Sequence, residues 1–315
     1  MADNLLVSSS PHFRGKNTTR RIMLDVIIAL IPATVAAIVL YGFKAALIIA
    51  VCVATSIGSE YIFNLLSKQK QTVGDLSAIV TGLLLALNLP AKAEVWHCFV
   101  GSVFAIVIVK CVFGGLGRNF ANPAITARVF LLIAFGKIAG GSATQFMTPE
   151  LVASATPLEV IKSGEGALPS LFEMLVGNRG GAIGEGCAIA LILGFIYLVA
   201  RKVIYIEPTL IFVGTVFVLS LIIKQDILLA TYEILGGGLL LGAIFMATDY
   251  VTTPTNRLGK SVFCFLCGII TVLIRFYGYY PEGVSFSILF MNIVSPYIQK
   301  LTRRKPLGTG GVKNA

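Results

Sequence analysis

Apolar residues occur in runs long enough to cross a lipid bilayer as helices, which takes about 20 residues. Because backbone polar groups find no water inside a bilayer, runs of this length predict helices and not strands. We therefore predict an all-α polytopic membrane protein of about ten transmembrane helices. The predicted spans are 22–43, 45–66, 76–90, 95–113, 123–140, 186–201, 205–223, 227–248, 260–278 and 283–299.

Two of these spans are irregular, and they hold matching positions. The span 76–90 is short for a membrane crossing, and the span 227–248 is interrupted by three consecutive glycines. Each is the third in a set of five, and both contain the tetrapeptide Gly-Leu-Leu-Leu. Paired broken spans are typical of inverted repeats with a site at their interface. We predict one repeat over 1–140 and the other over 186–302, although so short a tetrapeptide can also recur by chance.

Composition and charge favour a membrane protein without a water-soluble domain. The chain is 56% hydrophobic and 13% charged, about half the charged fraction of soluble proteins. Its net charge of +10 does not indicate nucleic-acid binding, because the basic residues are spread over short loops and span ends. Basic loops mark the cytoplasmic side. Both termini should therefore be cytoplasmic, including a tail at 303–315, while the long polar loop 141–185 faces outward.

This long loop carries the segment 147–159, Met-Thr-Pro-Glu-Leu-Val-Ala-Ser-Ala-Thr-Pro-Leu-Glu. Neighbouring spans need only a few connecting residues, so a loop of this length is expected to have a function. Pro157 favours an extended conformation at Thr156, whose hydroxyl we expect to be exposed. The alternative is that Thr156 only caps a short helix with Pro157 at its first position.

Charged residues within or beside the spans are candidates for function, because charges are costly in a membrane. Asp75 and Asp249 each flank a broken span and have hydroxyl-bearing neighbours. Such oxygen-rich sites suit Na⁺, a proton relay or hydrogen bonds to a flavin, but each carboxylate could equally cap a helix. We expect Asp25 and Glu60 to lie near the interfaces and to pair with basic loop residues. The remaining candidates are Lys110, Arg128, Glu233 and Arg275.

Five dispersed motifs resemble those of one family, the D subunits of Rnf complexes, which are related to the B subunits of sodium-translocating NADH:quinone oxidoreductases. The first is the segment around Thr156. The others are Ser-Ser-Ser-Pro-His at 8–12, Asp-x-Ser-Ala-x-x-Thr-Gly at 75–82, the Gly-rich stretch 113–124 that ends in Asn122-Pro123-Ala124, and the Met-Ala-Thr-Asp run 246–255.

The resemblance implies a prokaryotic cytoplasmic-membrane subunit of an ion-translocating ferredoxin:NAD oxidoreductase. It implies FMN joined through its phosphate to Thr156, with Ala153 and Ser154 departing from the usual motif. A second, non-covalent riboflavin would lie near the repeat interface, and Asn122, Asp75 and Asp249 are the candidate flavin-binding residues there. Iron–sulfur and other flavin subunits would be partners. The rival hypothesis is a stand-alone solute channel or transporter, since broken spans in inverted repeats also serve that purpose.

Overall fold

The computed structural model describes residues 18–135, 156–164, 168–177, 179–278 and 282–303. Within these ranges the chain forms helices joined by turns, and it contains no strand beyond an isolated bridge between Pro90 and Ala182. The prediction of an all-α fold is confirmed for this part of the chain. Residues 147–155 of the loop motif lie outside it.

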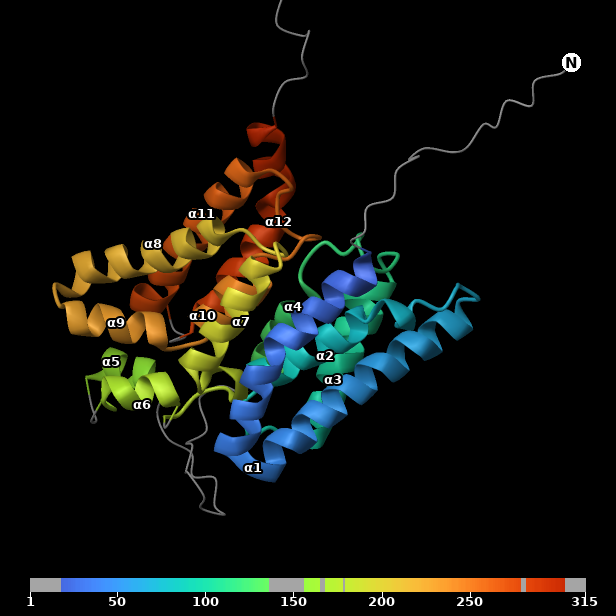
Figure 1. Ribbon diagram of the computed structural model, residues 1–315, viewed down its shortest axis with the longest axis horizontal. Helices are drawn as coiled ribbons and strands as arrows, with labels where there is room; N and C mark the ends of the chain where they lie inside the picture. The colour runs from blue at the N-terminus through green and yellow to red at the C-terminus, as the bar shows by residue number, and fades with distance from the viewer. Residues whose placement is uncertain (1–17, 136–155, 165–167, 178, 279–281, 304–315) are drawn as a thin grey trace, which may run out of the picture.

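The first helix, α1 (Thr19–Leu66), includes both of the first two predicted spans. It is interrupted at Gly42, where φ is 66° and ψ is −150°. Figure 1 shows the two halves, both in blue, meeting there at a sharp bend. Glycine adopts this positive φ without steric cost, so Gly42 separates two membrane-length segments inside one continuous element.

The rest of the N-terminal half packs around one short helix, α2 (Ser77–Asn88). Every residue of α2 except Ile79 is buried. Gly82 makes this burial feasible, because a Cβ there would lie 2.8 Å from the Cys52 carbonyl oxygen of α1. The other elements of this half are α3 (Val95–Val103), the π-helical η2 (Phe104–Cys111) and α4 (Pro123–Ala134).

Two short helices follow, α5 (Pro157–Ser163) and α6 (Leu171–Val176), and then the turn η4 (Ile183–Glu185). The C-terminal half comprises α7 (Ala188–Ala200), α8 (Ile206–Lys224), α9 (Ile227–Leu235), α10 (Leu239–Leu241), the π-helical η5 (Gly242–Met246), α11 (Arg257–Tyr277) and α12 (Val284–Thr302). The two halves meet where α7 packs against α1. A Cβ on Gly194 would overlap the Ala29 carbonyl oxygen.

Helix length and hydropathy support membrane insertion. Among the described residues, α1, α8 and α11 are long and apolar enough to span a bilayer. The segments 227–235 and 239–246 together form a fourth such element, bent by 60° at the glycines. Helices α2, α4 and α7 and the run 95–111 are apolar but shorter. The structure therefore describes a helical membrane protein, whereas ten spans and inverted repeats remain predictions.

Candidate functional site

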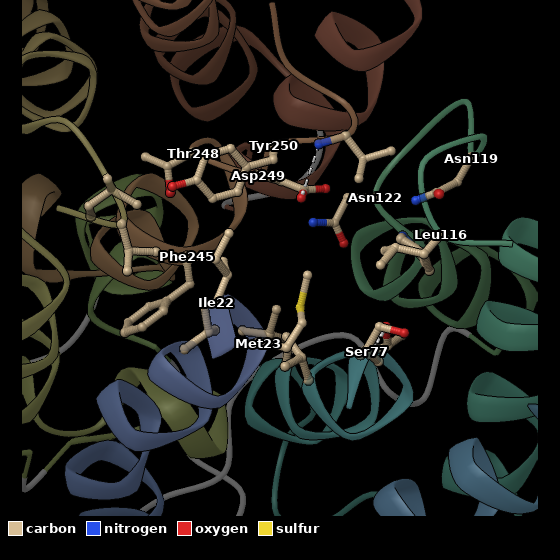
Figure 2. A pocket seen from close by; sticks show the side chains of 18 of the residues that line it. Ile22, Met23, Ser77, Leu116, Asn119, Asn122, Phe245, Thr248, Asp249 and Tyr250 are labelled. Atoms are coloured by element: carbon tan, nitrogen blue, oxygen red, sulfur yellow. Dashed lines mark hydrogen bonds between the residues drawn. The ribbon is translucent and has the colours of Figure 1, made fainter. Parts of the chain in front are cut away.

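A cavity of about 750 Å³, counting the space at its mouth, lies between the two halves of the fold. Its walls come from the start of α1, from α2, from the loop before α4 and from the end of η5. Figure 2 shows Met23, Phe245, Asn122 and Asp249 around this space. Mostly apolar walls with a few convergent polar groups are typical of small-molecule sites.

Two asparagines of the glycine-rich loop face this cavity. Asn122 is the N-cap of α4, where its Oδ1 accepts from the backbone N–H groups of Ala124 and Ile125 at 3.1 and 3.4 Å. Pro123 at the first helical position favours this start. Asn119 is 7% exposed, and its Oδ1 has no hydrogen-bond partner among the described residues. A buried amide oxygen without a partner is energetically costly, so this atom indicates a site for a ligand or a water molecule.

Asp249 also lines this cavity and lies just after η5. One carboxylate oxygen accepts from the Thr252 hydroxyl at 3.0 Å, and the other accepts from the Val251 N–H at 3.4 Å. Desolvation raises the pKa of this carboxyl above its usual range, although these hydrogen bonds and the nearby Lys260 oppose the rise. The side chain therefore accepts local hydrogen bonds and also lines the cavity, while its role beyond capping remains a prediction.

Asp75 has a different role, at the start of α2. Its carboxylate accepts from the backbone N–H of Ser77 at 2.8 Å and from the Ser77 hydroxyl, so it caps this helix as the alternative hypothesis predicted. Asp75 does not line the cavity, but Ser77 does. The two carboxylates that flank the broken spans therefore differ in position, since Asp249 lines the cavity and Asp75 does not.

Ser77 connects to a buried ion pair beside α2. Lys110 Nζ donates to both carboxylate oxygens of Glu60 at 2.9 Å and to Ser77 Oγ at 2.6 Å. Both charged side chains are almost completely buried, at 2% and 1% exposure. The expectation of an interfacial Glu60 paired with a loop residue is wrong, since its partner is an intrahelical lysine. It is right for Asp25, which pairs with Arg201 at 3.3 Å just beyond α7.

A second buried ion pair holds the glycine break of the C-terminal half. Arg275 Nη1 lies 2.9 Å from Glu233 Oε2, and Nη2 donates to the carbonyl oxygens of Gly236 and Gly237 at 3.2 Å. Gly237 and Gly238 both have positive φ, of 62° and 64°, which favours glycine. The arginine thus binds backbone carbonyls that the broken helix leaves without helical partners.

Thr156 lies away from the cavity, at the N-terminus of α5. It is 3% exposed, so the expectation of an exposed hydroxyl is wrong. Its Oγ1 accepts from the Glu159 N–H at 3.2 Å, and the Glu159 carboxylate accepts from the Thr156 N–H at 2.7 Å. This reciprocal capping turns the hydroxyl back onto the first helical turn. The backbone at Thr156 is extended, as Pro157 predicted.

The helix that begins after Thr156 packs directly on the second broken span. Leu158 contacts the glycine break, because a Cβ on Gly236 would lie 3.2 Å from two of its side-chain carbons. The Tyr232 hydroxyl of α9 also donates to the Pro169 carbonyl oxygen at 2.5 Å. The region that follows Thr156 is therefore packed on the same glycines whose carbonyl oxygens Arg275 binds.

A further polar cluster lies beside these glycines, and the sequence analysis missed two of its members. Arg128 of α4 forms an ion pair with Glu282, and Glu185 is buried next to Gly238. Desolvation and the neighbouring Glu282 raise the pKa of Glu185 to about 7, against the opposing effect of Arg128 and Arg179. Glu185 and Glu282 were missed because both lie outside the predicted spans, where a charge is unremarkable.

Among the sequence-predicted site residues, the structure brings Asn122 and Asp249 together around one cavity. Asp75 reaches this cavity only through Ser77, and Thr156 begins the helix that packs on the glycine break of the second broken span. Asn119 was overlooked, although its place in the glycine-rich loop three residues before Asn122 could have indicated it.

The apolar helices and the cavity between the two halves of the fold define an integral membrane protein with a candidate binding site. Residues 6–308 match the model of the NQR2, RnfD, RnfE family, and the chain belongs to this family. Prokaryotic relatives cover almost all of it. It is 44% identical to the D subunit of the Na⁺-translocating ferredoxin:NAD⁺ oxidoreductase complex of Acetobacterium woodii, over 98% of this chain and 97% of that protein. The D subunit of the proton-translocating ferredoxin:NAD⁺ oxidoreductase complex of Clostridium ljungdahlii is 36% identical, over 96% of each chain.

Proposed function

We propose that this chain is the membrane-embedded D subunit of a redox-driven, ion-translocating ferredoxin:NAD⁺ oxidoreductase, working with the other subunits of an Rnf-type complex. The observation that carries this proposal is the full-length similarity to two proteins named as the D subunits of such complexes. One of these relatives is named for Na⁺ and the other for protons, so similarity alone does not select the transported ion.

We further propose that FMN is attached through its phosphate to Oγ1 of Thr156. Support comes from the resemblance of the motif and from the position of this threonine at the start of α5, on the glycine break. The capping bond from Glu159 N–H keeps Oγ1 at a fixed place, and an ester oxygen can still accept that hydrogen bond. Attachment would require the buried hydroxyl to turn outward during modification.

The cavity in Figure 2 is our candidate for the second, non-covalent flavin. The fit rests on the unpartnered Oδ1 of Asn119 and on the apolar walls. Asn119, Asn122 and Asp249 would hold the polar edge of the ring, while Phe245 and Met23 would cover its apolar part. A flavin supplies one- and two-electron redox chemistry, and the protein sets its position and its potential.

The basic residues of the two buried ion pairs support the proposed inverted repeats. Lys110 and Arg275 both lie near the end of the fourth predicted span of their half. Their partners differ in position, since Glu60 lies in the second predicted span of its half and Glu233 in the third. The matching position of the two basic residues favours about ten spans in two repeats, with domains at 1–140 and 186–302. Cytoplasmic termini and an outward-facing loop 141–185 remain part of the proposal on the basis of charge.

The proposal is tested on the purified complex by denaturing gel electrophoresis under ultraviolet light. We expect the band of this chain to fluoresce, and Asn119→Leu to lower the extractable flavin without affecting that band. A non-fluorescent band would contradict FMN attachment, and a colourless, separately functioning chain would favour the transporter hypothesis.

A further inference from the structure

A second cavity, distinct in character from the first, lies between α12 and the loop after η5. Its volume is about 910 Å³, counting its open mouth. About half of the wall area is polar, contributed by residues that include Asn119, Thr252, Asn292 and Ser295, together with Lys300 and Arg303. Asn119 and Val251 line both cavities, so this site adjoins the proposed flavin site without being part of it.

Asn292 is the most informative residue of this cavity. It is 2% exposed, and neither its Oδ1 nor its Nδ2 has a hydrogen-bond partner among the described residues. An amide that is buried with both polar atoms unpaired destabilises the fold unless something else satisfies it. The occupant of the cavity must therefore offer both a donor and an acceptor to Asn292.

The remaining polar groups narrow the chemical class of this occupant. The free Oδ1 atoms of Asn292 and Asn119 need donors, which hydroxyl groups supply. The Asn292 Nδ2 and the exposed cations Lys300 and Arg303 need acceptors, and a phosphate supplies these with charge. A polyol that carries a phosphate satisfies both requirements, whereas an apolar ligand satisfies neither.

The surroundings of the cavity indicate that this polyol phosphate belongs to a lipid. The face of α12 that points away from the protein is apolar and exposed, with a spacing of three or four residues between Phe290, Ile293, Tyr297 and Leu301. Phe120, which is also exposed, lies at the cavity. Aromatic side chains and cations at the end of an apolar helix are typical of the level of lipid headgroups.

We propose that this cavity binds the glycerol-phosphate headgroup of an anionic phospholipid, with the acyl chains along the apolar face of α12. Headgroup hydroxyls would donate to Asn292, and the phosphate would lie near Lys300 and Arg303. Asn119 lines both cavities, but Asn292, Lys300 and Arg303 line only this one, so the test variants leave the lining of the proposed flavin cavity unchanged.

The test compares lipid retention by the intact purified complex, measured by native mass spectrometry. The variants are Asn292→Leu, which replaces the amide with an apolar side chain of similar size, and the surface double variant Lys300→Gln/Arg303→Gln. Lys70→Gln is the matched control for an exposed cation, and Ser220→Ala is the control for a buried unpartnered hydroxyl outside the described cavities. We expect both test variants to bind phosphatidylglycerol about tenfold more weakly, a loss of ~1.4 kcal/mol. Both controls should retain it.

Three results would overturn the proposal. Equal phosphatidylglycerol retention in all variants would exclude this site, and the rim variant gives that answer even if Asn292→Leu fails to fold. Stabilisation of the delipidated complex by glycerol 3-phosphate as strongly as by phosphatidylglycerol would mean that the ligand is water-soluble. If Asn292→Leu lost extractable flavin but retained phosphatidylglycerol, the cavity would be assigned to the ribityl chain of a flavin.

Discussion

Replacing Arg275 with methionine should strongly destabilise the protein. Methionine keeps the aliphatic packing of this side chain but removes its donors. Glu233 would then keep a buried carboxylate without its cation, and Gly236 and Gly237 would lose the donor to their carbonyl oxygens. The glycine break, and the α5 region packed on it through Leu158, depends on these bonds.

The expected magnitude follows from the burial of both charges, which are 2% and 4% exposed. Removing one partner of a buried ion pair costs about 3–5 kcal/mol, since the other charge is left without compensation. An exposed pair is worth at most about 1 kcal/mol. We therefore expect the free energy of unfolding to fall by about 3–5 kcal/mol in Arg275→Met.

A double variant separates the lost ion pair from the lost packing. In Arg275→Met/Glu233→Leu both charges are gone, so the protein should be more stable than the single variant by about 2 kcal/mol or more. Lys110→Met and Lys110→Met/Glu60→Leu should show the same order, because Lys110 and Glu60 are equally buried.

The assay is a titration of the purified protein with a denaturing detergent in mixed micelles, followed by circular dichroism. It can also be followed by the fluorescence of Trp96, the only tryptophan. A single Arg275→Met variant that loses less than about 1 kcal/mol would refute the reasoning, since that is the value of an exposed pair. A double variant less stable than the single one would also refute it.

Three further predictions concern the proposed function. Thr156→Ala should abolish the fluorescent band on a denaturing gel and lower stability by about 1 kcal/mol through the lost cap. Thr156→Ser keeps a hydroxyl and should retain part of the fluorescence and part of the stability. A fluorescent alanine variant would mean that another hydroxyl is the acceptor. Asp249→Asn should slow ferredoxin-driven NAD⁺ reduction in vesicles at least tenfold, which corresponds to about 1.4 kcal/mol on the barrier. The content of each subunit is the control for assembly, and a normal rate would mean that Asp249 is a structural residue. Ser163→Cys should react with an impermeant maleimide in intact cells, and labelling only after lysis would place the loop on the cytoplasmic side.

The sequence predicted the helices well, because apolar run length and glycine position are local properties. The predicted span 205–223 agrees with α8 (Ile206–Lys224) to within one residue at each end. The break expected within 227–248 lies at the three glycines. The predicted span 123–140 is less accurate, since α4 ends at Ala134. The bend at Gly42 agrees with the predicted division between the spans 22–43 and 45–66.

The site was only partly predictable, because it depends on which helix faces meet. Asn122 and Asp249 were candidates, and the structure brings them to one cavity. The sequence positions of the buried charges did not indicate that Glu60 pairs with Lys110, 50 residues away, or that Glu233 pairs with Arg275. Such pairs depend on the rotation of each helix about its axis, which run length does not determine. The capping role of Thr156 was also considered from the sequence, but its burial depends on the packing of α5.

The two buried ion pairs also constrain the order of events during biosynthesis. Glu60 leaves the ribosome 50 residues before Lys110, and Glu233 leaves 42 residues before Arg275. At about 5–20 residues per second, each carboxylate waits several seconds for its partner. A charge alone in the bilayer is unfavourable by a few kcal/mol. We therefore expect the helix that carries each glutamate to stay beside the insertion machinery, or to remain partly inserted, until the basic residue has been synthesised.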